Sequence, residues 1–151
     1  MSEKKRFADQ NKTIHDFYDE VWVVCPGCAQ KAFAKTLREN KTARLYCPDC
    51  GYHKETSMEC DIYGYTVLRI SPAHAYFRAE LWLQYPFKDH ILYAYNGSHL
   101  EYLESYIAAD LREHKDRTHF TLLEKLPKFY HEAKNRQALL VIIGKLKRKE
   151  S

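Results

Sequence analysis

Two short cysteine motifs constrain what this chain can fold into more than any other feature of its sequence. Cys25-Pro-Gly-Cys28 and Cys47-Pro-Asp-Cys50-Gly51 are C-P-x-C pairs separated by the 18 residues 29–46. The proline, glycine and aspartate in and after these pairs favour tight turns that bring two thiols together. This spacing is typical of a tetrahedral zinc site with four thiolates. We therefore predict that Cys25, Cys28, Cys47 and Cys50 are zinc ligands.

The predicted ligand set also indicates what the metal does. Four thiolates fill the coordination shell of a Zn²⁺ ion, whereas a zinc ion that activates water keeps one position open. We therefore expect a structural zinc ion that folds its own part of the chain. A redox dithiol or a pair of disulfides is the alternative interpretation, because single C-x-x-C motifs also occur in redox proteins.

The fifth cysteine and the hydropathy of the chain bear on its compartment. Cys60 lies ten residues after Cys50, and we interpret it as a free thiol. An unpaired thiol favours a reducing compartment. No segment approaches the roughly 18 to 20 apolar residues of a membrane span, and the amino terminus lacks an apolar signal region. We expect a cytoplasmic protein with no membrane partner.

The composition and the histidines argue against most enzyme classes. The chain is 45% hydrophobic and 29% charged, which is typical of a globular protein. Its eight histidines form no H-E-x-x-H motif and no deaminase pattern, and no nucleophile elbow or phosphate-binding loop is present. We assign no catalytic residue and predict a non-catalytic protein, with enzyme activity as an alternative.

Charge is concentrated between the two cysteine pairs. The formal net charge of +4 is only mildly basic, and a four-thiolate zinc site lowers it by about 2. Between the pairs, however, five cations face the single acidic residue Glu39. These cations are Lys31, Lys35, Arg38, Lys41 and Arg44. Such a basic arm suits phosphate contacts with DNA or RNA, and the alternative is a solvated hairpin surface.

Hydrophobic alternation predicts strands in both halves of the chain. Residues 17–24 and 43–46 are β-rich runs that lead into the two cysteine turns. Residues 62–70, 76–84 and 91–95 are rich in β-branched and aromatic residues and are expected to be three further strands. Strands in series with short connections indicate an antiparallel meander.

Capping signals and apolar stripes predict helices near the carboxyl terminus. Ser98 and Glu101 form a capping box, which predicts a helix from Ser98 to about residue 114. A second box, Thr121 to Glu124, is followed by Pro127, where a fresh helical start is expected. The last helix is predicted at about 135–147.

These elements combine into an α+β fold. We expect an amino-terminal four-cysteine zinc ribbon, an antiparallel β-meander, and carboxyl-terminal helices packed on the sheet. The corresponding division is a mobile tail over 1–14, the ribbon over 15–60, and a second domain over 61–151. The many aromatic rings either form the core between sheet and helices or, beside the basic arm, stack unpaired bases.

The motifs also resemble known proteins. On its four cysteines, the first third of the chain resembles the zinc ribbons of transcription factors, RNA polymerase subunits and ribosomal proteins. The remainder resembles a family of small, largely uncharacterised bacterial proteins with a zinc ribbon of the general-transcription-factor type. This second resemblance rests on segments 81–84, 95–96, 99–104, 126–128 and 133–136. It implies a zinc-bearing half joined to a helical half, and it implies no activity.

Together these observations lead to one functional prediction and one alternative. We predict a non-catalytic structural-zinc protein that binds nucleic acid or a transcription or translation assembly, with the five cations of the basic arm as phosphate contacts. The alternative is a protein-interaction adaptor that does not bind nucleic acid and uses the ribbon only as a scaffold.

Overall fold

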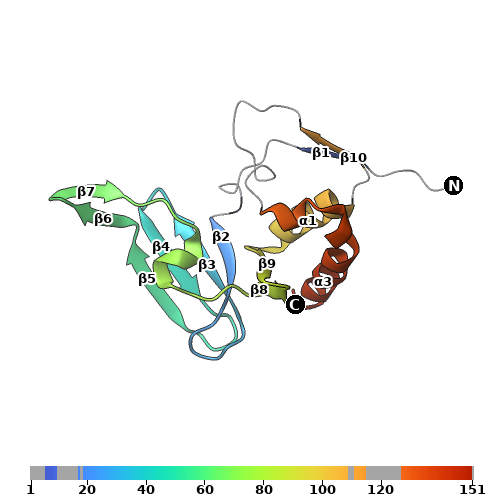
Figure 1. The fold of residues 1–151 in the computed structure, drawn as a ribbon. Coiled ribbons are helices and arrows are strands. Elements are labelled where there is room, and N and C mark those ends of the chain that lie inside the picture. The colour runs from blue at the N-terminus through green and yellow to red at the C-terminus, as the bar shows by residue number, and fades with distance from the viewer. Residues whose placement is uncertain (1–5, 10–16, 18, 109–110, 115–126, 151) are drawn as a thin grey trace. The chain divides into compact units, whose positions relative to one another are not determined.

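The fold is α+β and divides into two compact units. The computed structural model describes residues 6–9, 17, 19–108, 111–114 and 127–150 (Figure 1). One unit spans residues 17–83 and contains all five cysteines, while the other combines residues 1–16 and 84–151. The predicted division at residue 60, with a tail over 1–14, stays a prediction.

The first unit is built on a four-stranded antiparallel sheet (Figure 1). Its strands follow one another in sequence order, as β2 (Glu20–Val24), β3 (Lys31–Leu37), β4 (Thr42–Tyr46) and β5 (His53–Ser57). Successive side chains of a strand point to opposite faces, so alternation in the sequence makes the sheet two-sided. The expected strands leading into both cysteine turns are confirmed by β2 and β4.

One face of the sheet is buried over strands β2, β3 and β4. Its inward side chains are at most 1% exposed: Val21, Val23, Ala32, Ala34, Ala43 and Leu45. The 3₁₀ helix η2 (Ala73–Phe77) packs against β2, β3 and β4. Small alanines in the middle of the sheet, together with the buried Ala73, allow the backbone of η2 to approach closely. Burial of this apolar face stabilises the unit.

The chain then returns along the outer edge of β2. The amide of Val24 donates to the carbonyl of Glu80 at 2.8 Å, and the amide of Trp82 donates to the carbonyl of Trp22 at 3.0 Å. These bonds satisfy backbone groups at an edge that would otherwise be open. The predicted strand 76–84 is therefore wrong over its first residues, which belong to η2. The chain is extended only near the end of this range.

The predicted strand 62–70 is also wrong, because the segment contains a turn. β6 (Glu59–Ile62) and β7 (Tyr65–Leu68) form an antiparallel hairpin that projects from the four-stranded sheet (Figure 1). Tyr63 and Gly64 connect the strands with φ values of 50° and 83°. Two consecutive positive φ values are the signature of a tight hairpin turn. The β-branched and aromatic composition hid the turn, since only Gly64 indicates it.

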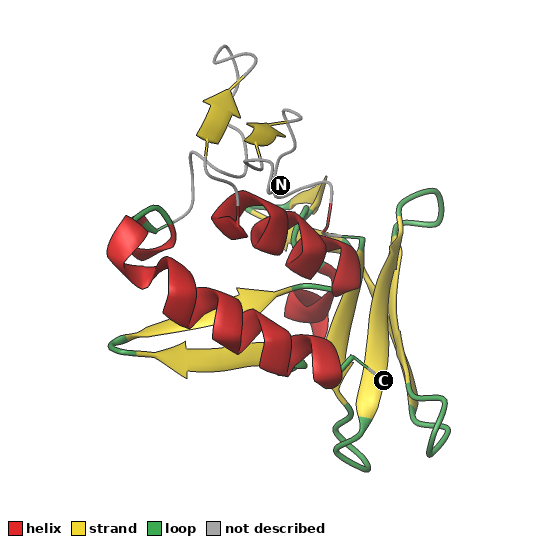
Figure 2. Cartoon of the chain, turned by 90° about the vertical axis from the view of Figure 1, so that its right-hand side faces the viewer, coloured by secondary structure: helices red, strands yellow, loops and turns green. Residues whose placement is uncertain are grey.

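The second unit packs two helices beside a hairpin (Figure 2). α1 (Gly97–Ala108) and α3 (Arg136–Arg148) contact one another, and α1 also contacts β9 (His90–Ala94) of the β8–β9 hairpin. β8 spans Leu83–Phe87. The core side chains are fully buried: Leu92, Leu100, Leu103, Ile107, Leu139, Ile143 and Leu146. The expected packing of carboxyl-terminal helices on a sheet is confirmed, and α3 matches its predicted range to within one residue.

Several local predictions in this unit need correction. The side chain of Asn96, not Ser98, caps α1, since its Oδ1 accepts from the amide of His99 at 2.9 Å. The helix ends at Ala108, and Leu111–His114 forms strand β10, paired in parallel with β1 (Arg6–Asp9).

Two further predictions concern prolines and a capping box. The connection between the predicted strands 76–84 and 91–95 is shorter than their bounds imply, because Pro86 lies within β8, where a two-stranded hairpin tolerates a missing amide. Pro127 is the amino-terminal cap of the 3₁₀ helix η3 (Lys128–Tyr130), near the predicted helical start. The capping box at 121–124 lies outside the described residues.

Within the described part of the chain, no helix combines the length and the apolar character needed to cross a lipid bilayer.

Candidate metal centre

The four cysteines lie on two turns of the same construction. The first turn joins β2 to β3, and the second joins β4 to β5. In the first, the amide of Cys25 donates to the carbonyl of Gln30 at 2.8 Å. In the second, the amide of Cys47 donates to the carbonyl of Tyr52 at 2.9 Å. Because β3 pairs with both β2 and β4, the two turns are held at the same end of the sheet.

The sulfur atoms of these turns meet in one cluster. The Sγ atoms of Cys25 and Cys50 are 3.6 Å apart, as are those of Cys28 and Cys47. All four Sγ atoms lie within 4.8 Å of one another. A tetrahedral ion with bonds of about 2.3 Å requires sulfurs separated by roughly 3.8 Å, whereas a disulfide requires about 2.05 Å. The cluster therefore has the dimensions of a four-thiolate metal site.

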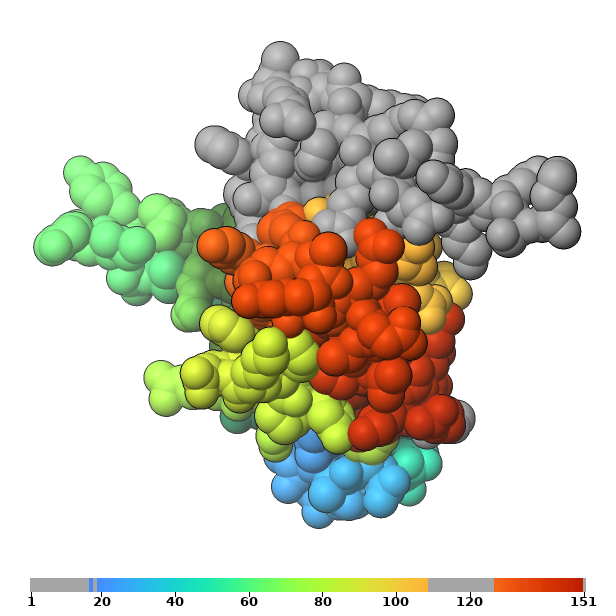
Figure 3. All heavy atoms as spheres, turned by 45° about the vertical axis from the view of Figure 1, so that its right-hand side comes forward, coloured from blue at the N-terminus to red at the C-terminus, as the bar shows by residue number. Residues whose placement is uncertain are grey.

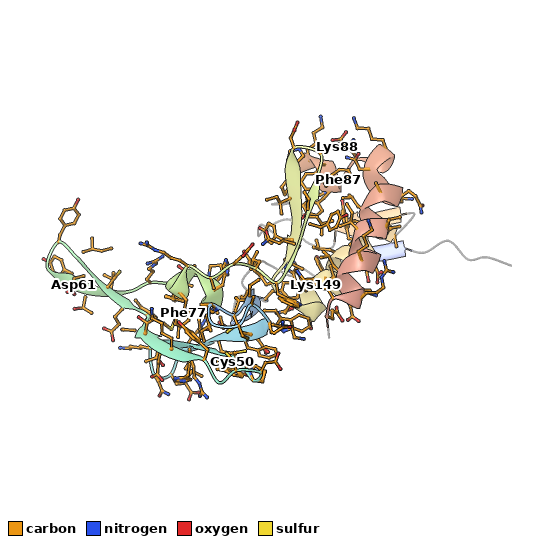
Figure 4. The ribbon with its side chains drawn as sticks, turned by 90° about the horizontal axis from the view of Figure 1, so that it is seen from below. Cys50, Asp61, Phe77, Phe87, Lys88 and Lys149 are labelled. Carbon is orange, nitrogen blue, oxygen red and sulfur yellow. The ribbon has the colours of Figure 1, made fainter. Side chains whose placement is uncertain are left out.

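The cluster is partly open to solvent. Cys25 and Cys47 are 2% and 3% exposed, Cys28 is half-buried and Cys50 is exposed. Figure 4 shows Cys50 and Asp61 at opposite ends of this unit, so the hairpin β6–β7 is remote from the sulfurs. An ion held here would therefore be bound most deeply by Cys25 and Cys47, the two buried thiols.

The pKa values of the Cys25 and Cys28 thiols are shifted in opposite directions. Burial acts to raise the pKa of Cys25, but hydrogen bonds from the amides of Cys28 and Gly27 outweigh it and lower this pKa to about 7. The amide of Gln30 acts to lower the pKa of Cys28, whereas burial and the neighbouring thiols raise it to about 12. The Cys25 thiol therefore ionises more readily than the Cys28 thiol. A bound cation reverses this order by favouring every thiolate.

The donor set and its geometry define what the cluster can do. Four sulfurs at tetrahedral spacing could hold one metal ion, and they leave no open coordination position at which a water molecule could be activated. Cys60 lies on β6, outside the cluster, and is half-buried. The arrangement therefore suits a structural metal site, as the cysteine spacing predicts.

The structure separates the five cations of the basic arm into two groups. Lys31, Lys35 and Arg44 lie on the outer face of the sheet, at positions that alternate with its buried residues. Arg38 lies in the β3–β4 connection, where its guanidinium is 3.2 Å from the carboxylate of Asp19. Lys41 ends that connection with a φ of 55°.

The outer face also carries aromatic rings, and the sequence interpretation did not single out Trp22 and Phe33 among them. Trp22 and Phe33 face one another across β2 and β3, and Phe33 faces Tyr46 across β3 and β4. The Lys31 Nζ lies 4.2 Å from the centre of the Trp22 ring. Alternation within β2 indicates that Trp22 faces outward, but no local signal in the sequence reveals which ring stands opposite it.

A comparison with known proteins finds no matching family model, no matching curated protein and no matching solved structure. The resemblance to zinc ribbons therefore depends on the four cysteines and on the turns that carry them.

Proposed function

We propose that Cys25, Cys28, Cys47 and Cys50 bind one structural Zn²⁺ ion. The supporting observation is that the four Sγ atoms lie within 4.8 Å of one another, on two turns with the same hydrogen-bond pattern. Soft thiolate donors in a tetrahedral arrangement favour zinc over the hard cations Mg²⁺ and Ca²⁺. The ion joins the β2–β3 and β4–β5 turns and so contributes folding free energy directly. Ligands that must remain reduced agree with a cytoplasmic location.

Elemental analysis of the purified protein tests the metal. We expect one zinc ion per chain, and a Co²⁺-exchanged sample should show the absorption bands of tetrahedral thiolate coordination. A folded amino-terminal unit that contains no metal, or a Cys25–Cys28 disulfide in protein kept reduced, contradicts the proposal.

The same unit is proposed to bind nucleic acid, alone or within a transcription or translation assembly. The observation that carries this proposal is the strand register, which brings Lys31, Lys35 and Arg44 onto one face of the sheet. Phosphate groups are bound by such surface cations without regard to sequence. Arg38 and Lys41 extend the basic surface toward the β3–β4 connection, although the ion pair with Asp19 reduces the contribution of Arg38.

Salt dependence of binding tests this proposal. Replacing Lys35 and Arg44 with alanine should weaken binding to every sequence and flatten the slope of log affinity against log salt by about 0.7 to 0.9 per contact. Lys54→Ala is the matched control, because Lys54 is an exposed lysine of the same sheet that faces Leu45 across β4 and β5 and so lies on the other face. The absence of binding to any DNA or RNA at low salt rejects the proposal.

A second candidate function, a protein-interaction adaptor, is favoured by the β6–β7 hairpin. Of the nine large hydrophobic side chains exposed in the described part of the chain, six lie between residues 62 and 70. The register gives the hairpin an apolar face, where Cys60 faces Val67 and Ile62 faces Tyr65. The hairpin protrudes in the space-filling view, in green (Figure 3). Exposed apolar patches of this kind are typical of docking surfaces.

The adaptor function predicts a partner that survives nuclease treatment. Pull-downs from nuclease-treated extract should lose that partner when Ile62 and Tyr65 are replaced with serine. Replacement of Thr66 with valine is the control, because Thr66 lies on the opposite face of the hairpin, where its hydroxyl donates to Asp61 at 3.0 Å. Equal recovery of the partner by the wild type and the serine variant rejects a role for the hairpin.

A further inference from the structure

The outer face of the four-stranded sheet carries one continuous row of rings. Trp22 stands opposite Phe33, Phe33 opposite Tyr46, and Tyr46 opposite His53, so the row crosses every strand from β2 to β5. The Trp22 and Phe33 ring centres are 6.4 Å apart in an edge-to-face arrangement. Phe33 and Tyr46 are 5.5 Å apart with nearly parallel rings. The rings of Trp22, Phe33 and Tyr46 therefore form one contiguous aromatic surface, and the strand register places His53 at its end.

This row departs from what a solvated sheet face requires. An antiparallel sheet with one buried face normally places polar side chains on the other face. Here η2 packs on the inward side of the sheet, which is lined by alanine and valine. On the outward side, Trp22, Phe33 and Tyr46 are half-buried and His53 is exposed. The three large rings on the outward side therefore do not belong to the buried core of this unit.

Cations border the row on both sides. Lys31 lies two positions from Phe33 along β3 on the side of the cysteine turns, with its Nζ 4.2 Å from the centre of the Trp22 ring. On the other side, Lys35 and Arg44 stand opposite one another. Their charged groups lie 5.7 Å and 5.4 Å from the centre of the Tyr46 ring. The face thus combines flat apolar rings with positive charge on two sides.

We propose that this face, which we name the aromatic platform and define as Trp22, Phe33, Tyr46 and His53, stacks the unpaired bases of single-stranded nucleic acid. The inference rests on the nucleic-acid binding proposed above and specifies its ligand. A single strand offers flat bases and a polyanionic backbone together, which matches rings flanked by cations. A duplex keeps its bases stacked inside the helix, where they cannot reach the platform.

The ligand preference is tested first with the zinc-loaded full-length protein. Affinities are measured by fluorescence anisotropy for labelled oligo(dT), oligo(U) and a duplex of equal length at low salt. The single strands should bind at least about tenfold more tightly than the duplex, because each stacked base contributes strongly to affinity. Comparison of the dT and U oligomers shows whether the platform also distinguishes DNA from RNA.

The rings are tested next with side chains of similar apolar character. Phe33→Leu and Tyr46→Leu should each weaken single-strand binding by about tenfold and leave the salt slope unchanged, because neither removes a phosphate contact. Tyr65→Leu is the matched control, since Tyr65 is an exposed ring of the same unit that lies on the hairpin β6–β7. Zinc content and circular dichroism establish that each variant is folded.

A spectroscopic measurement tests the platform without removing one of its rings. Trp22 and Trp82 are the two tryptophans of the chain, so a Trp82→Phe variant makes Trp22 the sole indole fluorophore. Stacking on the platform should quench this fluorescence when oligo(dT) or oligo(U) is added. Three results would contradict base stacking on the platform while leaving nucleic-acid binding intact. The duplex could bind as tightly as the single strands, both leucine variants could bind as tightly as the wild type, or the Trp22 emission could stay unchanged in a bound complex. Failure to bind any nucleic acid rejects both proposals.

Discussion

Ala29 and Gly51 occupy equivalent places in the two cysteine turns. Each lies four residues after the first cysteine of its pair, and each amide donates to the carbonyl of that cysteine, at 2.9 Å for Ala29 and 3.0 Å for Gly51. Both residues have a left-handed backbone, with φ values of 65° and 82°. Glycine adopts this conformation without steric strain, whereas alanine does not. The first turn is therefore strained where the second is relaxed.

This relationship predicts that substitutions at the two positions change the free energy of unfolding in opposite directions. Ala29→Gly should raise the free energy of unfolding by up to about 1 kcal/mol, since relief of left-handed strain exceeds the added entropy of the unfolded chain. Gly51→Ala should lower it by about 1 kcal/mol through strain alone, because an added Cβ meets no atom within 4 Å. Denaturant unfolding of the metal-loaded protein measures both. Changes of the same sign contradict the interpretation.

Loss of one cysteine should unfold one unit and spare the other. Cys47→Ser is expected to abolish stoichiometric zinc and to unfold the strands of residues 17–83, because the metal supplies folding free energy to that unit. The helical signal of α1 and α3 should persist in circular dichroism. Cys60→Ser is the control and should retain zinc, since Cys60 lies outside the sulfur cluster. Simultaneous loss of all structure contradicts the independence of the two units.

Acid should destabilise the helical unit through His99. Burial lowers the pKa of His99 from 6.5 to about 3, and its Nδ1 accepts a hydrogen bond from the amide of Tyr95 at 2.9 Å. Above pH 6.5 the imidazole is neutral in both states. As the pH falls toward 3, the unfolded chain takes up a proton that the native protein cannot, and the unfolding free energy drops by about 1.4 kcal/mol per pH unit.

A variant separates the effect of His99 on acid stability from the effect of acid on the metal site. His99→Gln should be less stable than the wild type near pH 7, and the difference should shrink as the pH falls from 6.5 to 5. The metal contribution cancels in this difference because both proteins carry the same four cysteines. Parallel pH profiles of the two unfolding free energies contradict a neutral buried histidine.

The tip of the β6–β7 hairpin should respond to a better turn residue. Tyr63 is 97% exposed with a φ of 50°, a conformation for which asparagine is suited. Tyr63→Asn should therefore stabilise the hairpin by about 0.5 to 1 kcal/mol, while Gly64→Ala should destabilise it. Hydrogen exchange of the β6 and β7 amides measures both effects. Faster exchange in the asparagine variant indicates that the Tyr63 ring contributes a contact in solution.

Local patterns predicted those parts of the fold whose determinants lie close together in the chain. The spacing of Cys25, Cys28, Cys47 and Cys50 predicted that the four thiols meet, since each pair needs only one tight turn and a hairpin brings the turns together. The amphipathic stripe near the carboxyl terminus likewise predicted a helix at about 135–147, close to the observed α3, because side chains three and four residues apart share a face.

Competing local signals were resolved by packing. Asn96 and Ser98 are both good amino-terminal caps, and the structure uses Asn96, which directly precedes the first residue of α1 and lies two residues after the end of β9. In the same way, the return of residues 80–82 to the edge of β2 decided that only the end of the predicted strand 76–84 is extended. The second choice depends on contacts between segments that are distant in the sequence.

The sequence by itself determined the composition of the sulfur cluster and the positions of the basic residues. Only the tertiary structure decided which of those residues share a surface. Trp22, Phe33 and Tyr46 are separated by more than ten residues from one to the next, and they form one row because the register of β2, β3 and β4 aligns them. Register depends on hydrogen bonds between strands and on burial of a common face, so shifting one strand by a single residue would turn its rings to the other side.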